Sequence, residues 1–135
     1  MRAFGLAFVA TAIMVTTANV TTAMADDGRF ERSLEMLAPA ERLEQLCDFT
    51  AMTRIRSERK DFRPDRAVAN AMAESLAKDD TLEVTGGAFR SKKRWYALAY
   101  RCTATPDHLK IVAFNYKIGE EIPESKWASF GLWQQ

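Results

Sequence analysis

The chain contains one histidine, His108, the side chain best suited to act as a general base near neutral pH. A histidine base needs a nucleophile and an orienting acid beside it, and Asp107 directly precedes it. The segment Thr105-Pro106-Asp107-His108, however, is typical of a tight turn. None of the candidate nucleophilic serines has a nucleophile-elbow context; they are Ser91, Ser125 and Ser129. We therefore favour a turn-forming His108 and assign no catalytic residue.

A second candidate is a dense cluster of positive charge with an aromatic neighbour. It consists of Arg90, Lys92, Lys93 and Arg94, followed by Trp95. Because Ser91-Lys92-Lys93 is typical of a polar hairpin tip, we expect these charges in solvent. Such a patch suits an anionic partner, such as lipid phosphate, an acidic polysaccharide or an acidic protein face. The alternatives are a tip that only keeps the hairpin soluble, or pairing with the acidic Glu120, Glu121 and Glu124.

The chemistry of the two cysteines depends on the first 25 residues. Met1-Arg2 is basic, Ala3 to Val15 is uncharged and apolar, and Ala23-Met24-Ala25 has the small-x-small pattern of a cleavage site. This order is that of a secretory signal peptide. Its apolar run is shorter than the roughly 20 residues of a membrane span. We expect cleavage after Ala25 and a mature protein that is periplasmic or secreted, without a transmembrane span.

Cys47 and Cys102 are the only cysteines. In an oxidising compartment, a pair of cysteines in a small domain usually forms a disulfide. The alternative, a redox-active pair, lacks the C-x-x-C spacing that lowers a thiol pKa. We therefore expect a structural bridge between helix and sheet.

Length and charge restrict the class of protein. Removing residues 1–25 from the 135 leaves 110, which suits one small domain over residues 26–135. Only Arg2 of the 19 basic residues lies in the predicted leader, so this domain has 18 basic and 18 acidic side chains. A general nucleic-acid binder has a strong basic excess, so we expect no nucleic acid. The acidic clusters lack the spacing of a calcium loop, and we expect neither metal nor cofactor.

Apolar spacing predicts the helices. Phe30, Leu34 and Leu37 form one stripe, and Pro39 is suited to the first position of a second helix. The buried face of that second helix is expected to comprise Leu43, Leu46, Cys47, Thr50, Met52 and Ile55. For residues 64–77, the spacing of Val68, Met72 and Leu76 favours a third helix. A strand through Ala67, Ala69 and Ala71 is the alternative.

From residue 82 the period changes to two, which predicts strands. Gly86-Gly87 indicates a bulge in the first strand. In the second strand, over 95–103, the inward residues are Tyr96, Leu98, Tyr100 and Cys102, and the outward ones Trp95, Ala97, Ala99 and Arg101. In the third, over 110–118, the inward residues are Val112, Phe114, Tyr116 and Ile118. We predict an α+β fold: two or three N-terminal helices packed on one face of a three-stranded antiparallel meander, with one disulfide.

The C-terminal aromatics allow two interpretations. Trp127, Phe130 and Trp133 lie three residues apart, a spacing that suits one face of a short helix covering the sheet. If they are exposed together with Trp95, they form an apolar patch large enough to be a binding surface.

Several strings resemble one family of secreted bacterial proteins, domain-of-unknown-function family 930. They are residues 37–48 (LAPAERLEQLCD), 63–66 (RPDR), 88–91 (AFRS), 93–96 (KRWY), 102–108 (CTATPDH) and 116–123 (YKIGEEIP). The resemblance implies a Gram-negative envelope location and a Cys47–Cys102 pair, but no activity. We expect a periplasmic, non-enzymatic binding or interaction module. The alternatives are a structural or envelope-stress protein with no small ligand, and a small hydrolase-like enzyme using His108.

Overall fold

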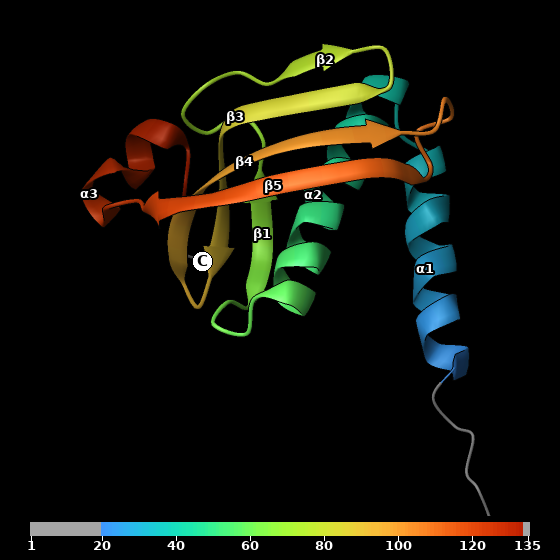
Figure 1. The fold of residues 1–135 in the computed structure, drawn as a ribbon, viewed down its shortest axis with the longest axis horizontal. Coiled ribbons are helices and arrows are strands. Elements are labelled where there is room, and N and C mark those ends of the chain that lie inside the picture. The colour runs from blue at the N-terminus through green and yellow to red at the C-terminus, as the bar shows by residue number, and fades with distance from the viewer. Residues whose placement is uncertain (1–19, 134–135) are drawn as a thin grey trace, which may run out of the picture.

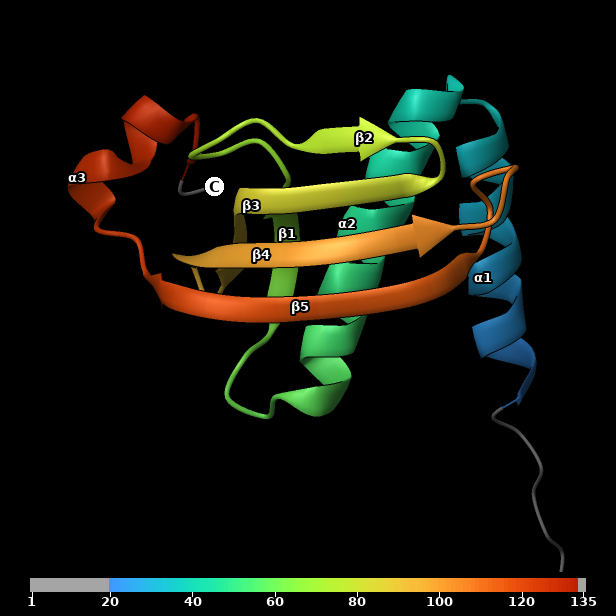
Figure 2. The ribbon, with the colours of Figure 1, turned by 45° about the horizontal axis from the view of Figure 1, so that its top comes forward.

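The computed structural model describes residues 20–133, with side chains from residue 28, so most of the predicted signal peptide lies outside the described residues. The elements, in chain order, are α1 (Val20–Glu35), α2 (Pro39–Glu58), β1 (Pro64–Val68), β2 (Leu76–Lys78), β3 (Thr81–Ser91), β4 (Arg94–Ala104), β5 (Ile111–Glu121), α3 (Glu124–Trp127) and the 3-10 turn η1 (Ala128–Phe130). Both long helices lie on one side of the strands (Figures 1 and 2). The predicted α+β class and the two N-terminal helices are confirmed.

The sheet has five antiparallel strands, so the predicted three-stranded meander is not matched: β3, β4 and β5 do lie side by side, but β1 and β2 also pair with β3. The strand order is β1-β3-β4-β5, and β2 also pairs with β3. The predicted third helix over 64–77 is wrong, because this segment forms β1, a loop and β2 along one edge of β3. Main-chain pairing with that open edge outweighs the helix propensity of the alanines, which is the highest of any residue but is routinely overridden by tertiary context. The alternative strand is correct for Ala67 but ends at Val68.

The predicted bulge at Gly86-Gly87 is confirmed, and the sheet bends there. The β3–β4 register shifts between Val84 and Gly87. A Cβ on Gly86 would collide with the backbone of Ala73, and one on Gly87 would lie 3.0 Å from the carbonyl oxygen of Leu98. The absence of side chains therefore allows this close approach. Beyond the bend, the tip of the β3–β4 hairpin runs beside β1 (Figure 1).

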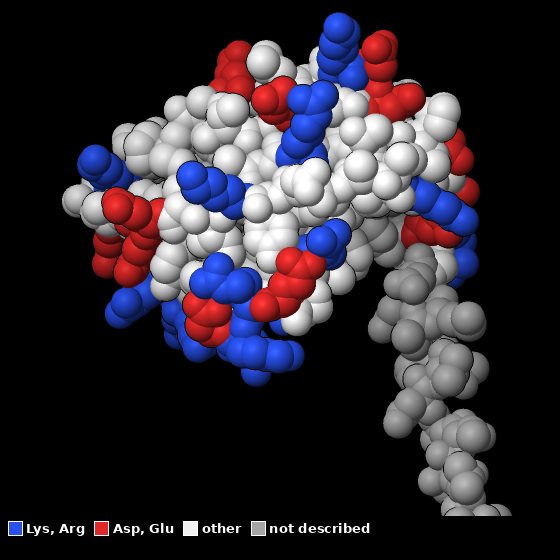
Figure 3. Space-filling model, viewed as in Figure 1, with Lys and Arg blue, Asp and Glu red and all other residues white. Residues whose placement is uncertain are grey.

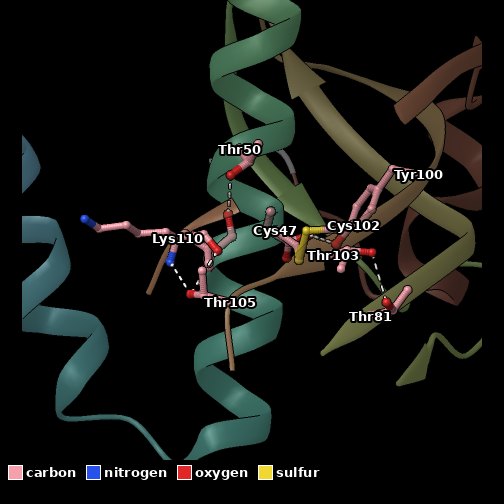
Figure 4. Close-up of a disulfide and its surroundings, with 10 residues drawn as sticks. Cys47, Thr50, Thr81, Tyr100, Cys102, Thr103, Thr105 and Lys110 are labelled. Atoms are coloured by element: carbon pink, nitrogen blue, oxygen red, sulfur yellow. Dashed lines mark hydrogen bonds between the residues drawn. A yellow bond between two sulfur atoms is a disulfide. The ribbon is translucent and has the colours of Figure 1, made fainter. Parts of the chain in front are cut away.

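The main core lies between α2 and the inner face of the sheet. The helix contributes Leu43, Cys47, Ala51 and Ile55, which recur every four residues and are all buried. The predicted disulfide Cys47–Cys102 is present and joins α2 to β4 (Figure 4). Leu98, Tyr100 and Cys102 are buried as predicted, whereas Tyr96, Thr50 and Met52 are only half-buried.

Bulges also interrupt the β4–β5 ladder. One register shift lies between Thr103 and Ala104, where Ile111 and Ala113 have partners and Val112 does not. Val112 is consequently 65% exposed, and its predicted inward position is wrong. A second shift lies beside Gly119.

A second hydrophobic cluster covers the opposite face of the hairpin. It is formed by Ala88, Trp95, Ile122, Trp127 and Leu132. Trp95 lies on the strand face predicted to be outward, but of the two interpretations the one with Trp95 exposed is wrong, because the C-terminal segment covers the ring. The indole Nε1 of Trp95 donates to the carbonyl oxygen of Trp133 at 2.8 Å. Trp127 is buried and Phe130 half-buried, while Trp133 remains 43% exposed.

Candidate functional site: a basic end and a groove

The predicted basic cluster is divided by the structure. Lys92, Lys93 and Arg94 are exposed at the hairpin tip. Arg90 is only 6% exposed, and its guanidinium makes two hydrogen bonds to the carboxylate of Asp65, at 2.8 and 2.7 Å. The Arg90 hydrogen bonds hold the pKa of the Asp65 carboxyl below its usual range. Arg90 and Trp95 thus support the hairpin from within and do not belong to its exposed surface.

The tip has an unusual backbone. Both Lys92 and Lys93 have positive φ, at 50° and 65°. A two-residue hairpin loop with two such residues is the type I′ turn, which favours Asn-Gly because Cβ is crowded at positive φ, and Gly lacks this atom while Asn tolerates the conformation. Two lysines in these positions place positive charge at the tip at a cost in backbone energy.

A second segment adds to this surface. The loop after α2 adjoins the hairpin tip, because the backbone N–H of Arg63 donates to Ser91 Oγ at 2.8 Å. The hydrogen bond from Arg59 lowers the pKa of Asp61, and the charge of Lys92 adds to this effect. The combined surface, called here the basic end, comprises Arg59, Lys60, Arg63, Lys92, Lys93 and Arg94. Figure 3 shows Lys and Arg gathered along the lower edge of the molecule, where these two loops end in Figure 1.

The acidic side chains near the basic end are largely engaged. Asp61 pairs with Arg59 at 3.0 Å, and Glu121 lies 3.6 Å from Arg94. The predicted pairing of the tip with the acidic segment is therefore seen for Arg94 and Glu121. A hollow of about 410 Å³ lies between these partners and is lined by Lys92, Lys93, Arg94, Glu121, Glu124 and Trp127. Among the described residues, Lys60, Lys92 and Lys93 have no ion-pair partner within 4 Å.

His108 has a structural position. It is 8% exposed, its Nδ1 donates to the carbonyl oxygen of Pro39 at 2.8 Å, and its Nε2 lies 3.0 Å from Asp80 Oδ1. The ring thereby connects the start of α2 to the turn between β2 and β3. The neighbouring Asp107 instead accepts from Thr105 and from the backbone of Leu109. This arrangement matches the turn-forming role, and both ring nitrogens are engaged away from any hydroxyl.

Sequence reasoning missed a buried acidic pair beside the disulfide. The hydroxyl of Tyr100 donates to Asp48 Oδ1 at 2.8 Å. Burial raises the pKa of the Asp48 carboxyl to about 7, against the opposing effect of this hydrogen bond, and the charge of Glu44 adds to the rise. Burial also raises the pKa of Tyr100, as does the Asp48 charge. The signal was in the sequence: Asp48 follows Cys47, and Tyr100 shares a strand face with Cys102, so the disulfide brings the two side chains together.

Asp48 opens onto a groove of about 240 Å³ between α2, β1 and the C-terminal segment. Its lining is Phe30, Gln45, Asp48, Phe49, Met52, Asp65, Arg66, Ala67, Val68 and Trp133. Phe30 and Phe49 stack with ring centroids 4.0 Å apart. On the other wall, the Arg66 guanidinium lies 5.3 Å from the centroid of the Trp133 ring. The groove therefore combines aromatic walls with one buried carboxyl.

Within residues 20–133, no three His, Cys, Asp or Glu side chains are grouped to hold a metal ion. None of the described helices has the length and apolar character needed to cross a bilayer.

No curated protein and no solved structure matches the chain. A family model does match, over residues 34–132, which include the disulfide, the basic end and all of the groove lining except Phe30 and Trp133. The chain therefore belongs to the family described as Domain of Unknown Function (DUF930).

Proposed function

We propose that this protein is a non-enzymatic binding module of the bacterial cell envelope, which holds a phosphate-bearing anionic surface through its basic end. The observation that carries the proposal is the meeting of two loops about 30 residues apart, each rich in Lys and Arg. Residues 58–63 and 91–94 together contain six basic and two acidic side chains. This local excess contrasts with the neutral balance of the predicted mature chain.

The geometry suits an extended array of anions better than one small ligand. The hairpin tip projects from the fold, and its lysines are compact point charges on flexible stems. Such charges attract many phosphates at once and need no fixed hydrogen-bond geometry. The predicted signal peptide, with a mature chain beginning at Asp26, would bring this surface to the envelope.

The test compares binding of the oxidised mature chain to vesicles of phosphatidylglycerol mixed with phosphatidylcholine, measured by co-sedimentation. We expect Lys92→Gln/Lys93→Gln/Arg94→Gln to weaken binding on the order of a hundredfold, since each basic residue near an anionic surface contributes about 1 kcal/mol. The matched control, Lys78→Gln/Lys110→Gln/Lys117→Gln, removes three exposed charges from other parts of the sheet. Equal loss in both variants, or none in the first, would contradict the proposal.

A purely structural role with no ligand is the second candidate, and it predicts that the tail aromatics are buried. Trp127 fits this prediction, whereas Trp133 is exposed at the mouth of the groove. The vesicle experiment separates the two candidates, because a purely structural protein would not bind the vesicles that contain phosphatidylglycerol.

A further inference from the structure

The groove beside Asp48 is separate from the basic end and has a different chemistry. Asp48 is buried, and no Lys, Arg or His nitrogen of the described residues lies within ion-pair distance of its carboxylate. Tyr100 occupies Oδ1, while Oδ2 has no hydrogen-bond partner among those residues. Oδ2 is also not among the atoms sealed from solvent without a partner. It therefore faces the groove that Asp48 lines.

The surroundings of Asp48 favour a positively charged occupant. Glu44 acts on Asp48 as a like charge, and Tyr100 only donates a hydrogen bond. Asp65, on the β1 wall, is neutralised by the two hydrogen bonds from Arg90. The cationic side chain in the lining, Arg66, has its guanidinium over the Trp133 ring. The groove therefore holds one carboxylate without a paired cation, Asp48, while the Arg66 guanidinium, which has no ion pair among the described residues, lies against Trp133 on the other wall.

The walls suit an apolar arm next to that charge. Phe49 is 40% exposed and stacked on Phe30, so it presents a fixed aromatic surface to the groove. Met52 and Val68 extend this surface. Aromatic faces attract cations, and a hydrogen bond between an ammonium group and a carboxylate is stronger than one between neutral groups. The volume of about 240 Å³ suits a small molecule.

We propose that this groove binds a small organic cation, with its ammonium group on Asp48 and its apolar arm against Phe49. The proposal is independent of the basic end, which carries the opposite charge and lies on the loops that follow α2 and β3. It gives the protein a second ligand class and leaves the proposed anionic partner unchanged.

The test is a two-dimensional NMR titration with three probes of similar size: phenethylammonium, 2-phenylethanol and 3-phenylpropionate. We expect saturable shifts of the Phe49, Met52 and Val68 amides, with phenethylammonium binding about tenfold more tightly than the alcohol, the range of a charge-assisted hydrogen bond. The amides of Lys92 and Lys93 should remain unshifted with this probe. Equal binding of the alcohol, tighter binding of the carboxylate, or no saturable shift would overturn the proposal.

Two variants identify the groups responsible. Asp48→Asn keeps the shape and the acceptor for Tyr100 but removes the charge, so it should abolish the preference for the cation. Asp61→Asn, an exposed carboxylate of the basic end, is the matched control and should leave the preference intact. Phe49→Ala should weaken binding of both the cation and the alcohol several-fold. A preference for the cation that survives Asp48→Asn would contradict the assignment.

The pH dependence gives a further readout. Since burial raises the pKa of Asp48 to about 7, ionisation of this carboxyl between pH 6 and 8 should tighten binding of the ammonium about tenfold. Binding tightens as the pH rises because only the ionised Asp48 carboxylate attracts the cation, and an alkylammonium keeps its proton over this pH range. Binding to Asp48→Asn should be flat with pH. Identical pH profiles for the two proteins would overturn the role of Asp48.

Discussion

The two hydrophobic clusters lie on opposite faces of the same bent sheet and are built in different ways. The main core joins α2 to the inner strand face and is crossed by the Cys47–Cys102 disulfide. The second cluster has no helix of comparable length and depends on a short C-terminal segment lying over Trp95. That segment is held by two indole hydrogen bonds, from Trp95 to Trp133 and from Trp127 to Ile122.

The difference concerns how each cluster is stabilised. In the main core, a covalent bridge restricts the unfolded chain, and a 20-residue helix covers the inner face of the sheet. In the second cluster, Ile122, Trp127 and Leu132 lie outside the loop that the disulfide closes. We therefore expect the main core to determine global stability and the second cluster to open separately. Removing one stabilising element from each region tests this expectation.

The largest effect is expected from the bridge. Cys47→Ala/Cys102→Ala should lower the free energy of unfolding by about 4 kcal/mol, the chain-entropy estimate for a loop of this length. The sequence separation of the two cysteines is 55. The measurement is urea denaturation of the variant and the oxidised parent protein at one temperature. An unchanged midpoint would show that the main core does not rely on the bridge.

A smaller and more local effect is expected from Trp127. Trp127→Ala removes a buried ring of the second cluster and should cost about 3 kcal/mol. By hydrogen exchange, the amide of Trp95 should lose protection while those of Tyr100 and Cys102 keep theirs. Equal loss of protection at all three amides would mean that both clusters open as one unit, which would contradict the expected difference between them.

The smallest effect is expected at the hairpin tip, with the opposite sign. Lys92→Asn/Lys93→Gly matches the positive φ of both positions and should raise the free energy of unfolding by about 1–2 kcal/mol. Lys92→Gln/Lys93→Gln removes the same charges without relieving the turn and is the control. Thermal denaturation compares the two. A similar melting temperature for both would show that the turn conformation carries no cost.

The features that sequence predicted well are those set by local spacing. Leu43, Cys47 and Ile55 follow one helical stripe and are buried as predicted, and Gly86-Gly87 predicts the bulge because few other residues tolerate such a close approach of the backbone. The wrong predictions have non-local causes. Val112 is turned outward by a bulge set in the β4–β5 ladder, and Trp95 is covered by a segment about 30 residues away.

The candidate sites show the same division. The exposure of the tip lysines could be predicted from the turn sequence. The burial of Arg90 could not, because it depends on hydrogen bonds to Asp65 on a neighbouring strand. Residues 64–77 had helical spacing but lie along a strand edge, and this pairing depends on the whole sheet. The groove combines residues from α1, α2, β1 and the C-terminal segment, so no local sequence pattern predicts it.

The register shifts in the β4–β5 ladder affect how easily two copies of the protein could aggregate at high concentration. This strand ends the sheet on one side, and an unpaired strand is where two copies of a protein can join into a longer sheet. Its ladder with β4 is continuous only from Ala113 to Ile118, because the register shifts on both sides. Lys117 adds a charge within that stretch. The edge strand β5 therefore offers a second copy of the protein only a short regular segment for main-chain pairing. This protects the protein against edge-to-edge aggregation into fibrils.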